Sequence, residues 1–375
     1  MNDQIDRLRL IRTEGVGPLT YRRLMARFGG VTQAIAALPE LARAGGRAVT
    51  KIPSRADAER EMAQLCKIGG NFIFVDTPDY PAFLADMADA PPVLAVLGNV
   101  KLLLTRCVGV VGARNASANG MRMAEQLAAD LAEQRLTVVS GLARGIDAAA
   151  HKGAMATGRT IAAIAGGIDV PYPPENEKLQ AQIAENGCVV AEAPFGTAAM
   201  AKHFPKRNRV IAGLSLGLVV IEAAVRSGSL ITARMANEAG REIFAVPGSP
   251  LDPRCKGSND LIRQGAHLTE SAADVLANLP DHPAREGLAR DPLFVHARSG
   301  FAEKPALWEA ASEAEMAIGR RKIPDLVGPD PVMVDEIARR CQLSISAIMA
   351  VLLELEIAGK VEMLAGNRVV RVTTE

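Results

Sequence analysis

The chain has 375 residues, enough for two or three domains with a sizeable core, and a formal net charge of +1. Because the overall field is so weak, a polyanionic partner would have to meet a local cluster of bases. Aromatic residues are only 3% of the chain, which excludes a surface that binds nucleic acid mainly by stacking many bases.

The cysteines and the apolar runs indicate the cellular setting. The five cysteines lie far apart, with neither zinc-ligand spacing nor a disulfide pattern. No apolar run reaches the roughly 18 residues needed to cross a bilayer, and the charged N-terminus lacks the apolar core of a signal peptide. We therefore expect a cytoplasmic protein with no membrane segment and no bound metal.

Residues 1–54 are predicted to form a small helical domain. Leu8, Leu10, Ile11, Leu24 and Phe28 recur at helical spacing, and residues 15–19 (GVGPL) between them read as a tight turn. This layout is typical of a helix-hairpin-helix or SAM-like domain. Such a turn either contacts DNA phosphates through its backbone amides or simply joins two helices, and the sequence leaves both alternatives open.

Residues 55–280 are predicted to form a Rossmann-like domain with its core at 105–280 and a lead-in segment at 55–104. The predicted strands are 108–111, 136–140, 160–165, 188–191, 218–221, 242–246 and 266–268. The predicted helices are 117–134, 147–156, 175–185, 208–214, 229–239 and 258–263. Near-continuous apolar strands that alternate with helices indicate a doubly wound, mostly parallel α/β sheet covered on both faces.

Two further segments complete the domain organisation. Residues 281–325 are rich in Pro, Ala, Arg and Asp and are predicted to be a linker with a short helix near 307–316. Residues 326–375 have the pattern of a winged helix: helices at 334–340 and 345–358, then a hairpin of 361–364 with 368–372.

The second helix of this winged helix does not look suited to reading bases. It carries Glu354 and Glu356 and no base before Lys360, whereas a helix in the major groove usually presents Arg, Lys, Asn or Gln. Only Asn367, Arg368 and Arg371 look ready to contact phosphates. We expect this helix to pack or to meet a protein partner, without sequence-specific reading of duplex DNA.

The most informative stretch of the chain is the basic run at 202–209, KHFPKRNR. It holds four Lys/Arg residues, one His and one Asn, and the apolar residues 210–214 follow directly. Cations held at the edge of a packed element are typical of a polyanion site, although a solvated loop is the simpler alternative.

Ligands of doubly wound sheets gather at the carboxyl ends of the strands. The loops predicted there include 112–117 (GARNAS), 140–147 (SGLARGID) and 227–233 (SGSLITA), in which small residues open helices and expose backbone N–H groups. With the basic run they predict one phosphate-binding crest. Its candidate residues are Arg114, Ser140, Gly141, Arg144, Lys202, Lys206, Arg207, Asn208, Arg209, Ser227, Gly228 and Ser229, with Phe204 as the candidate base contact.

The acids near this crest are interpreted as structural. Asp147 and His151 lie four residues apart on one helix face, so an acid/base pair is conceivable. We favour instead an acid that satisfies backbone amides and a histidine bonded among the crest loops. Glu192 and Glu222 are expected to orient Arg207, Arg209 or a loop amide, and no catalytic residue is assigned.

Two nucleotide motifs are rejected. Residues 153–160 (GAMATGRT) nearly match a Walker A loop, but this segment ends a helix and opens a strand, which is the reverse of a P-loop. No GxGxxG follows the first core strand either, so we expect no nucleotide cofactor.

The motifs together resemble the DNA-processing protein A family (DprA, also called Smf). The resemblance runs from about residue 105 to 270, through 112–114 (GAR), 140–147 with His151, 172–176 (YPPEN), 203–209 (HFPKRNR), 213–215 (GLS), 227–233 and 246–248 (VPG). The helical and winged-helix regions on either side are also similar to those of the family.

This resemblance implies a bacterial protein that binds single-stranded DNA, protects incoming strands in natural transformation and loads the RecA recombinase onto them. It also implies a homodimer formed through the Rossmann-like domain. The family's phosphate-binding positions correspond to Arg114, to the run of Lys202, Arg207, Asn208 and Arg209, and to the loop at 227–229.

Two alternatives belong to other functional classes. Related Rossmann folds hydrolyse nucleotide ribosides with a Gly-rich loop that carries a catalytic acid, but here residues 227–233 contain no acid and Glu238 is the first to follow. The second alternative is a dimeric scaffold whose basic run pairs with an acidic protein.

Overall fold

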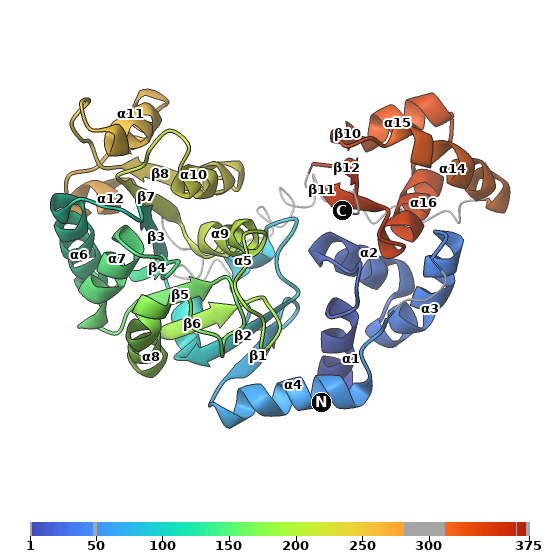
Figure 1. Ribbon diagram of the computed structural model, residues 1–375, viewed down its shortest axis with the longest axis horizontal. Coiled ribbons are helices and arrows are strands. Elements are labelled where there is room, and N and C mark those ends of the chain that lie inside the picture. The colour runs from blue at the N-terminus through green and yellow to red at the C-terminus, as the bar shows by residue number, and fades with distance from the viewer. Residues whose placement is uncertain (1, 48–50, 281–311, 365, 373–375) are drawn as a thin grey trace, which may run out of the picture. The chain divides into compact units, whose positions relative to one another are not determined.

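The structure, a computed structural model, describes residues 2–47, 51–280, 312–364 and 366–372, and a nine-stranded sheet forms the core of its larger unit (Figure 1). The strands are β1 (Asn71–Phe74), β2 (Val93–Gly98), β3 (Cys107–Gly112), β4 (Thr137–Ser140), β5 (Thr160–Ile164), β6 (Cys188–Ala191), β7 (Gly217–Ile221), β8 (Glu242–Ala245) and β9 (His267–Leu268). Their order across the sheet is β1-β2-β6-β5-β4-β3-β7-β8-β9. Strands β3 to β9 run parallel, and β1 and β2 pair antiparallel.

The mostly parallel, doubly wound fold expected from the sequence is confirmed. All seven predicted strands are present with their ends within one residue of the expectation. The segment 55–104 is more than a lead-in, because β1 and β2 extend the sheet beyond β6. Both strands pair antiparallel. They were missed because the prediction relied on the alternation of strands and helices, which identifies only parallel strands.

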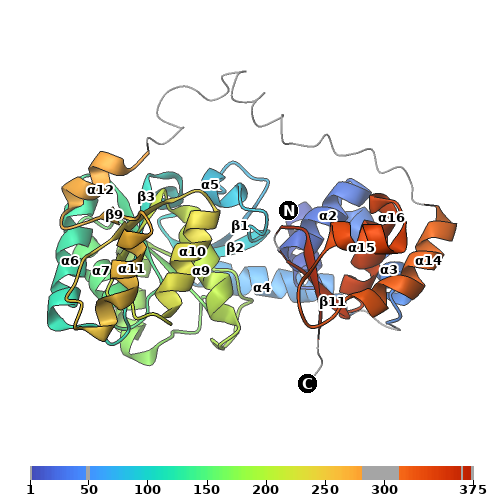
Figure 2. The same ribbon diagram turned by 90° about the horizontal axis from the view of Figure 1, so that it is seen from above.

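Helices cover both faces of the sheet (Figures 1 and 2). They are α5 (Ala82–Ala85), α6 (Ala118–Glu133), α7 (Ile146–Met155), α8 (Glu177–Asn186), α9 (His203–Leu214), α10 (Gly228–Glu238), α11 (Lys256–Arg263) and α12 (Ala272–Asn278). Side chains of α9 and α10 share one buried cluster with Val111 and Val220. Side chains of α6, α7 and α12 share another with Val108 and Val110, as the alternation of side chains along a strand requires.

The chain order creates a switch point at the centre of the sheet. From β3 the chain moves outward through β4, β5 and β6, and then returns so that β7 pairs with the other side of β3. The crossovers on the two sides of β3 therefore leave a crevice at the carboxyl ends of β3 and β7, where doubly wound sheets bind ligands.

The helix that carries the basic run begins earlier than predicted. Helix α9 starts at His203, so most of the run is helical, and the expected start at residue 208 was wrong. Pro205 lies in the first turn, where its missing N–H and fixed φ are tolerated. As a result Arg207, Asn208 and Arg209 are buried rather than displayed along a loop.

Arg209 anchors α9 to two carboxylates. Its guanidinium pairs with Glu192, directly after β6, and with Asp89 at 3.3 Å, while the Arg209 side chain is only 9% exposed. The expectation that Glu192 orients an arginine is thus confirmed.

Asp147 and His151 have structural roles on α7. Asp147 Oδ2 accepts hydrogen bonds from the backbone N–H groups of Gly141 and Ala143 at 3.2 and 3.3 Å, as expected. His151 is fully buried, and its Nδ1 lies 2.7 Å from Thr160 Oγ1 at the start of β5. The expectation that His151 bonds among the crest loops was wrong, because α7 leads away from the carboxyl edge.

The two ends of the chain form a second unit. The structure divides into residues 61–285 and a unit that combines 1–60 with 286–375. This second unit contains α1 (Asn2–Ile11), α2 (Pro18–Phe28), α3 (Val31–Ala44), α14 (Glu313–Leu326), β10 (Val332–Met333), α15 (Val334–Cys341), α16 (Ile345–Ile357), β11 (Val361–Leu364) and β12 (Arg368–Arg371), and α4 (Arg55–Lys67) follows the first three helices.

The predicted winged helix is confirmed, and the predicted linker needs correction. Most of the range 281–325 lies outside the described residues, but its last part forms α14. Met316 and Ile323 of this helix share a buried core with Val351 of α16. Within the described ranges, no helix combines the length and the apolar character needed to cross a membrane.

The buried histidine predicts a pH dependence of stability. Burial, and next the charge of Arg207, lower the pKa of His151 to about 3. Unfolded His151 takes up a proton below about pH 6.5 and folded His151 does not, so its contribution to stability is present above that pH and is lost as the pH falls toward 3. Relative to His151→Asn, the wild-type free energy of unfolding should fall by up to about 1.4 kcal/mol per pH unit between pH 6.5 and 4. Parallel pH profiles in urea titrations of the two proteins would contradict this role.

The anchor of α9 predicts a loss of stability without Arg209. Arg209→Met leaves Glu192 and the partly exposed Asp89 without their cation, and should lower the free energy of unfolding by about 2 to 3 kcal/mol. The exposed neighbour Lys206 offers the control, since Lys206→Met should change stability by less than about 0.5 kcal/mol. Equal denaturant midpoints for the two variants would show that the anchor contributes nothing.

Candidate functional site

Two adjoining clefts lie at the carboxyl edge of the sheet. The first, which we call the switch-point cleft, has a volume of about 530 Å³ and is bounded by the loop after β3, by α9 and by the start of α10. The second, the side cleft, has a volume of about 250 Å³ and lies toward Tyr172 and Pro173. Arg114, Ala143, Phe204 and Arg207 line both clefts.

Arg207 is the most unusual residue of the site. Its side chain is 6% exposed, and its Nε and Nη1 atoms have no hydrogen-bond partner in the described part of the chain. Nη1 reaches Asp147 only as a long ion pair of 3.7 Å. Burial lowers the pKa of Arg207, and the Asp147 charge opposes that shift. Buried donors are normally satisfied, so these N–H groups are an exception that needs an explanation.

Glycine at position 141 makes room for this arginine. A Cβ atom on Gly141 would lie 1.1 Å from Arg207 Nη1, so any other residue would displace the guanidinium. Gly141 also lines the side cleft. Gly141 was predicted to expose its backbone amide, but its main effect is to leave room for the Arg207 side chain.

One aromatic ring contacts both of the arginines that line the two clefts. The guanidinium carbons of Arg114 and Arg207 lie 5.1 and 5.8 Å from the centre of the Phe204 ring. The Tyr172 ring lies 5.8 Å from Phe204 at an angle of 59°. Cations over ring faces are favourable, and they hold the arginines toward the clefts.

The start of α10 contributes backbone donors to the switch-point cleft. Ser227 is the N-cap in extended conformation and makes no side-chain cap bond, while its Oγ lies 2.7 Å from Ser229 Oγ. A Cβ on Gly228 would meet nothing within 4 Å, so the backbone here is open to an approaching group. The first N–H groups of a helix lack intrahelical partners and favour anions.

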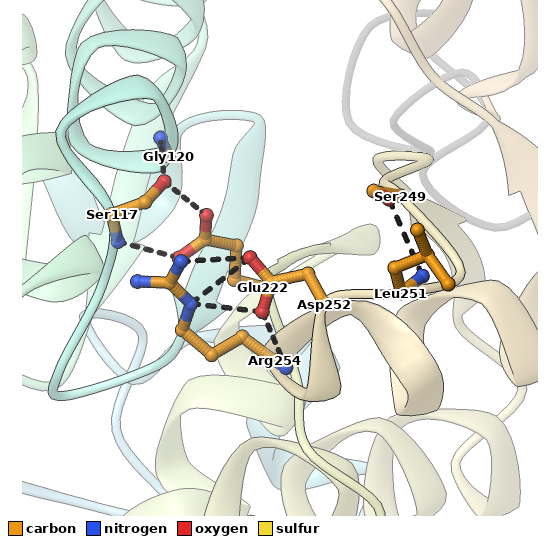
Figure 3. Close-up of polar contacts among 7 residues, drawn as sticks. All are labelled: Ser117, Gly120, Glu222, Ser249, Leu251, Asp252 and Arg254. Carbon is orange, nitrogen blue, oxygen red and sulfur yellow. Dashed lines mark hydrogen bonds and ion pairs between the residues drawn. The ribbon is translucent and has the colours of Figure 1, made fainter.

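Glu222, at the end of β7, organises the loop after β3 (Figure 3). Its carboxylate accepts hydrogen bonds from the Ser117 backbone N–H at 2.8 Å and from the Ser117 hydroxyl, and Ser117 Oγ caps α6 through Gly120 N–H at 2.9 Å. The expectation that this acid orients a loop amide is confirmed.

Arg254 is a cation of the switch-point cleft that the sequence analysis missed. It bonds Asp252 through Nε, Nη2 and its backbone N–H, which fixes the direction of its side chain (Figure 3). Nothing in the local sequence signals this, because Arg254 reaches the cleft only through the connection that follows β8. Tyr172 was also missed as a site residue, although a tyrosine after a core strand of an aromatic-poor chain was a usable signal.

The structure brings together only part of the predicted crest. The residues that line a cleft are Arg114, Gly141, Arg144, Phe204, Arg207, Asn208, Ser227, Gly228 and Ser229. Arg144 reaches the side cleft beside Glu175, at 3.8 Å. Lys202 and Lys206 are exposed at the start of α9 and line neither cleft.

Two predicted site residues belong to the interior. Ser140 is fully buried, and its hydroxyl donates to the Val110 carbonyl at 2.6 Å. Arg209 lines neither cleft and is held by Glu192 and Asp89. The helical periodicity explains the split of the basic run, because residues 207 and 209 lie on different sides of α9.

The Rossmann-like unit matches a known family model. Residues 71–280 match the model described as DNA recombination-mediator protein A. Residues 1–63 match a DprA-like N-terminal HHH domain, and residues 309–367 match a DprA winged helix domain.

Known proteins are similar over much of the chain. Protein Smf of Synechocystis sp. is 33% identical over 95% of this chain and 96% of its own length. The DNA processing protein DprA of Streptococcus pneumoniae is 47% identical over 53% of this chain and 70% of its own.

Two solved structures are also similar. The X-ray structure of DprA from Streptococcus pneumoniae has a TM-score of 0.63 at 36% identity, and covers 75% of this chain and 99% of its own. A structure of DNA processing protein A from Helicobacter pylori, which describes a unique single-stranded DNA binding mode of that protein, has a TM-score of 0.51 at 27% identity, with coverages of 56% and 95%. The order of motifs, the switch-point geometry and these matches agree, and the chain belongs to the DNA-processing protein A (DprA/Smf) family.

Proposed function

We propose that this protein is a recombination mediator that binds single-stranded DNA in the switch-point cleft and the side cleft. The observation that carries the proposal is the buried Arg207, which lines both clefts and has two donor atoms without a hydrogen-bond partner among the described residues. Family membership supports the DNA-processing role, and the Helicobacter pylori relative supports the single strand as the ligand.

Phosphates suit the switch-point cleft. It combines Arg114, Arg207 and the helix start at Ser227, Gly228 and Ser229, and each offers donors to an anion without presenting a surface that fits one base. We propose that Asn208 and Arg254 add further contacts there, and that Lys202 and Lys206 act only through their field at the rim. This arrangement favours binding with little dependence on sequence.

A base suits the side cleft. Tyr172, Pro173 and Phe204 give it apolar walls, and Arg144 stands at its edge. An unpaired base can leave its stack to enter such a space, whereas a base in a duplex would first have to break its pairing. We therefore propose that Phe204 and Tyr172 contact one splayed base and that the site prefers single strands.

The finer role follows the family. We propose that the protein acts as a homodimer in the cytoplasm, protects incoming single strands in natural transformation and loads the RecA recombinase onto them. Support for these steps comes from family membership. Sedimentation of the purified protein tests the dimer, and RecA-dependent strand exchange with and without the protein tests the loading.

The alternative of a nucleotide-riboside hydrolase has no specific support in the site. Asp147 is the acid that lines the switch-point cleft, and it is engaged by two backbone amides and by Arg207. Release of free base from a nucleoside monophosphate by the purified protein would revive this alternative.

Fluorescence anisotropy with labelled oligonucleotides tests the main proposal. The protein should bind single-stranded DNA more tightly than duplex of the same length, and the logarithm of the binding constant should fall by roughly 0.7 per neutralised phosphate for each tenfold rise in salt. Equal affinity for duplex, or no binding of single strands, would overturn the proposal.

Arg114→Ala gives a sharper test. Arg114 is exposed and its truncation should cost little stability, yet binding of single strands should weaken roughly tenfold and the salt slope should shrink by about 0.7. Lys101→Ala removes an equal charge from the turn before β3, at the opposite edge of the sheet, and should leave both quantities unchanged. If the two variants behave alike, the clefts do not hold the strand.

A further inference from the structure

Helix α16 of the winged helix is enclosed along most of its length. Along α16, residues 350 to 357 are all buried, and so are Ala347 and Ile348. In winged helices that read DNA, the corresponding helix leaves one face open to enter the major groove. A helix that is covered all round is instead a core element, so α16 must have a protein surface on each side.

One side of α16 faces the rest of the winged helix. Val351 and Leu355 pack in its core with Ile323 of α14. Arg320 of α14 donates two hydrogen bonds to the Glu354 carboxylate at 2.8 and 2.9 Å. This paired geometry satisfies one of the two acids on the helix.

The N-terminal helical domain covers the other side. Gly45 follows α3 and approaches the α16 backbone so closely that a Cβ would lie 2.1 Å from the Glu354 carbonyl oxygen and 2.7 Å from the Ala358 Cβ. Gly15, in the turn between α1 and α2, lies against the end of the same helix, since its Cβ would lie 3.1 Å from the carbonyl oxygens of Glu356 and Ile357.

A buried ion pair joins the same two elements. Arg23 of α2 lies 3.5 Å from Glu356, and their side chains are only 14% and 8% exposed. Glu356 also accepts the Met363 backbone N–H at 3.1 Å, which ties the pair to the first strand of the wing. Burial raises the pKa of Glu356 and lowers that of Arg23, as expected where both are withdrawn from water.

We infer that the recognition-helix face of the winged helix is a protein-docking surface whose occupant is the N-terminal helical domain of the same chain. The two ends of the sequence then fold as one unit, into which the Rossmann-like domain is inserted. In this state α16 cannot enter a major groove, and the Gly15 side of the hairpin turn cannot approach DNA phosphates. Any duplex or protein partner of α16 would first have to displace the helical domain.

Cleavage of the full chain tests this inference. A protease recognition sequence placed within residues 281–311 allows the winged helix to be cut from the rest of the purified protein. If the helical domain holds it, the winged-helix fragment should co-elute with the larger fragment in gel filtration at micromolar concentration. Separate elution of the two wild-type fragments would overturn the inference.

Two glycine variants make the test specific. Gly45 has φ −73° and ψ −4°, which any residue tolerates, so Gly45→Ala disturbs the contact with α16 rather than the local backbone. It should weaken retention of the cut fragment at least tenfold. Gly17→Ala is the matched control, because Gly17 has φ −89° and nothing lies within 4 Å of its added Cβ.

Hydrogen exchange on the uncut chain separates lost docking from lost folding. In Gly45→Ala the amides of α16 and α3 should exchange faster, while those of β3 to β7 keep their protection. Unchanged exchange together with full retention of the fragment in Gly45→Ala would show that the contact does not hold the two domains together.

Discussion

The Rossmann-like unit buries the charged side chain of Arg207, and a buried cation is stable only close to an anion. Its guanidinium lies over Gly141 and forms a long ion pair with Asp147, and two of its donor atoms have no hydrogen-bond partner in the described structure. Leaving a buried charge so incompletely satisfied is costly, and the cost is offset when a ligand supplies the missing acceptors. Gly141, Asp147 and helix α9 hold this side chain in place.

Helix α9 is held from two directions. Arg209 binds Glu192 and Asp89 on one side, while Arg207 and Asn208 meet the clefts on the other. The apolar residues that follow pack into the core beneath the sheet. Two arginines only two residues apart therefore differ in their surroundings: Arg209 fixes the helix, and Arg207 lines the clefts.

The sheet topology supplies the rest of the site. Because the chain returns from β6 to β7 on the far side of β3, the loops after β3 and β7 come to lie beside the start of α10. Glu222 couples two of these elements by bonding Ser117. The clefts thus depend on contacts between segments about one hundred residues apart, which no local pattern specifies.

In the second unit, the winged helix has its usual fold, but its helix α16 is covered by protein. The wing and its helices match the winged-helix pattern, yet the helix that would read bases is enclosed by α14 and by the N-terminal helices. Its apolar sequence and its two acids already argued against base reading. The structure adds the reason for the acids, since Arg320 and Arg23 pair with them.

Sequence alone determined the elements whose signals are local. Apolar runs located the core strands within a residue, and the helix expected at 345–358 matches α16 (Ile345–Ile357) within a residue, because burial periodicity and capping act over a few residues. The predicted start of α9 was wrong because Pro205 was interpreted as part of a loop, although a proline is tolerated in the first turn of a helix.

The tertiary structure alone decided which charges face the clefts. Arg207 and Arg209 have equal charge and lie two residues apart, and only the position of carboxylates from distant segments separates the cleft-lining residue from the anchor. For the same reason, Arg254 lines the cleft although it was not predicted to, and Ser140, which was predicted to, is buried in the interior. The sequence thus predicted a cluster of basic residues at this edge of the sheet. Three-dimensional packing decided which of them line the clefts, because the free energy of a buried charge depends on neighbours that the chain brings from far away.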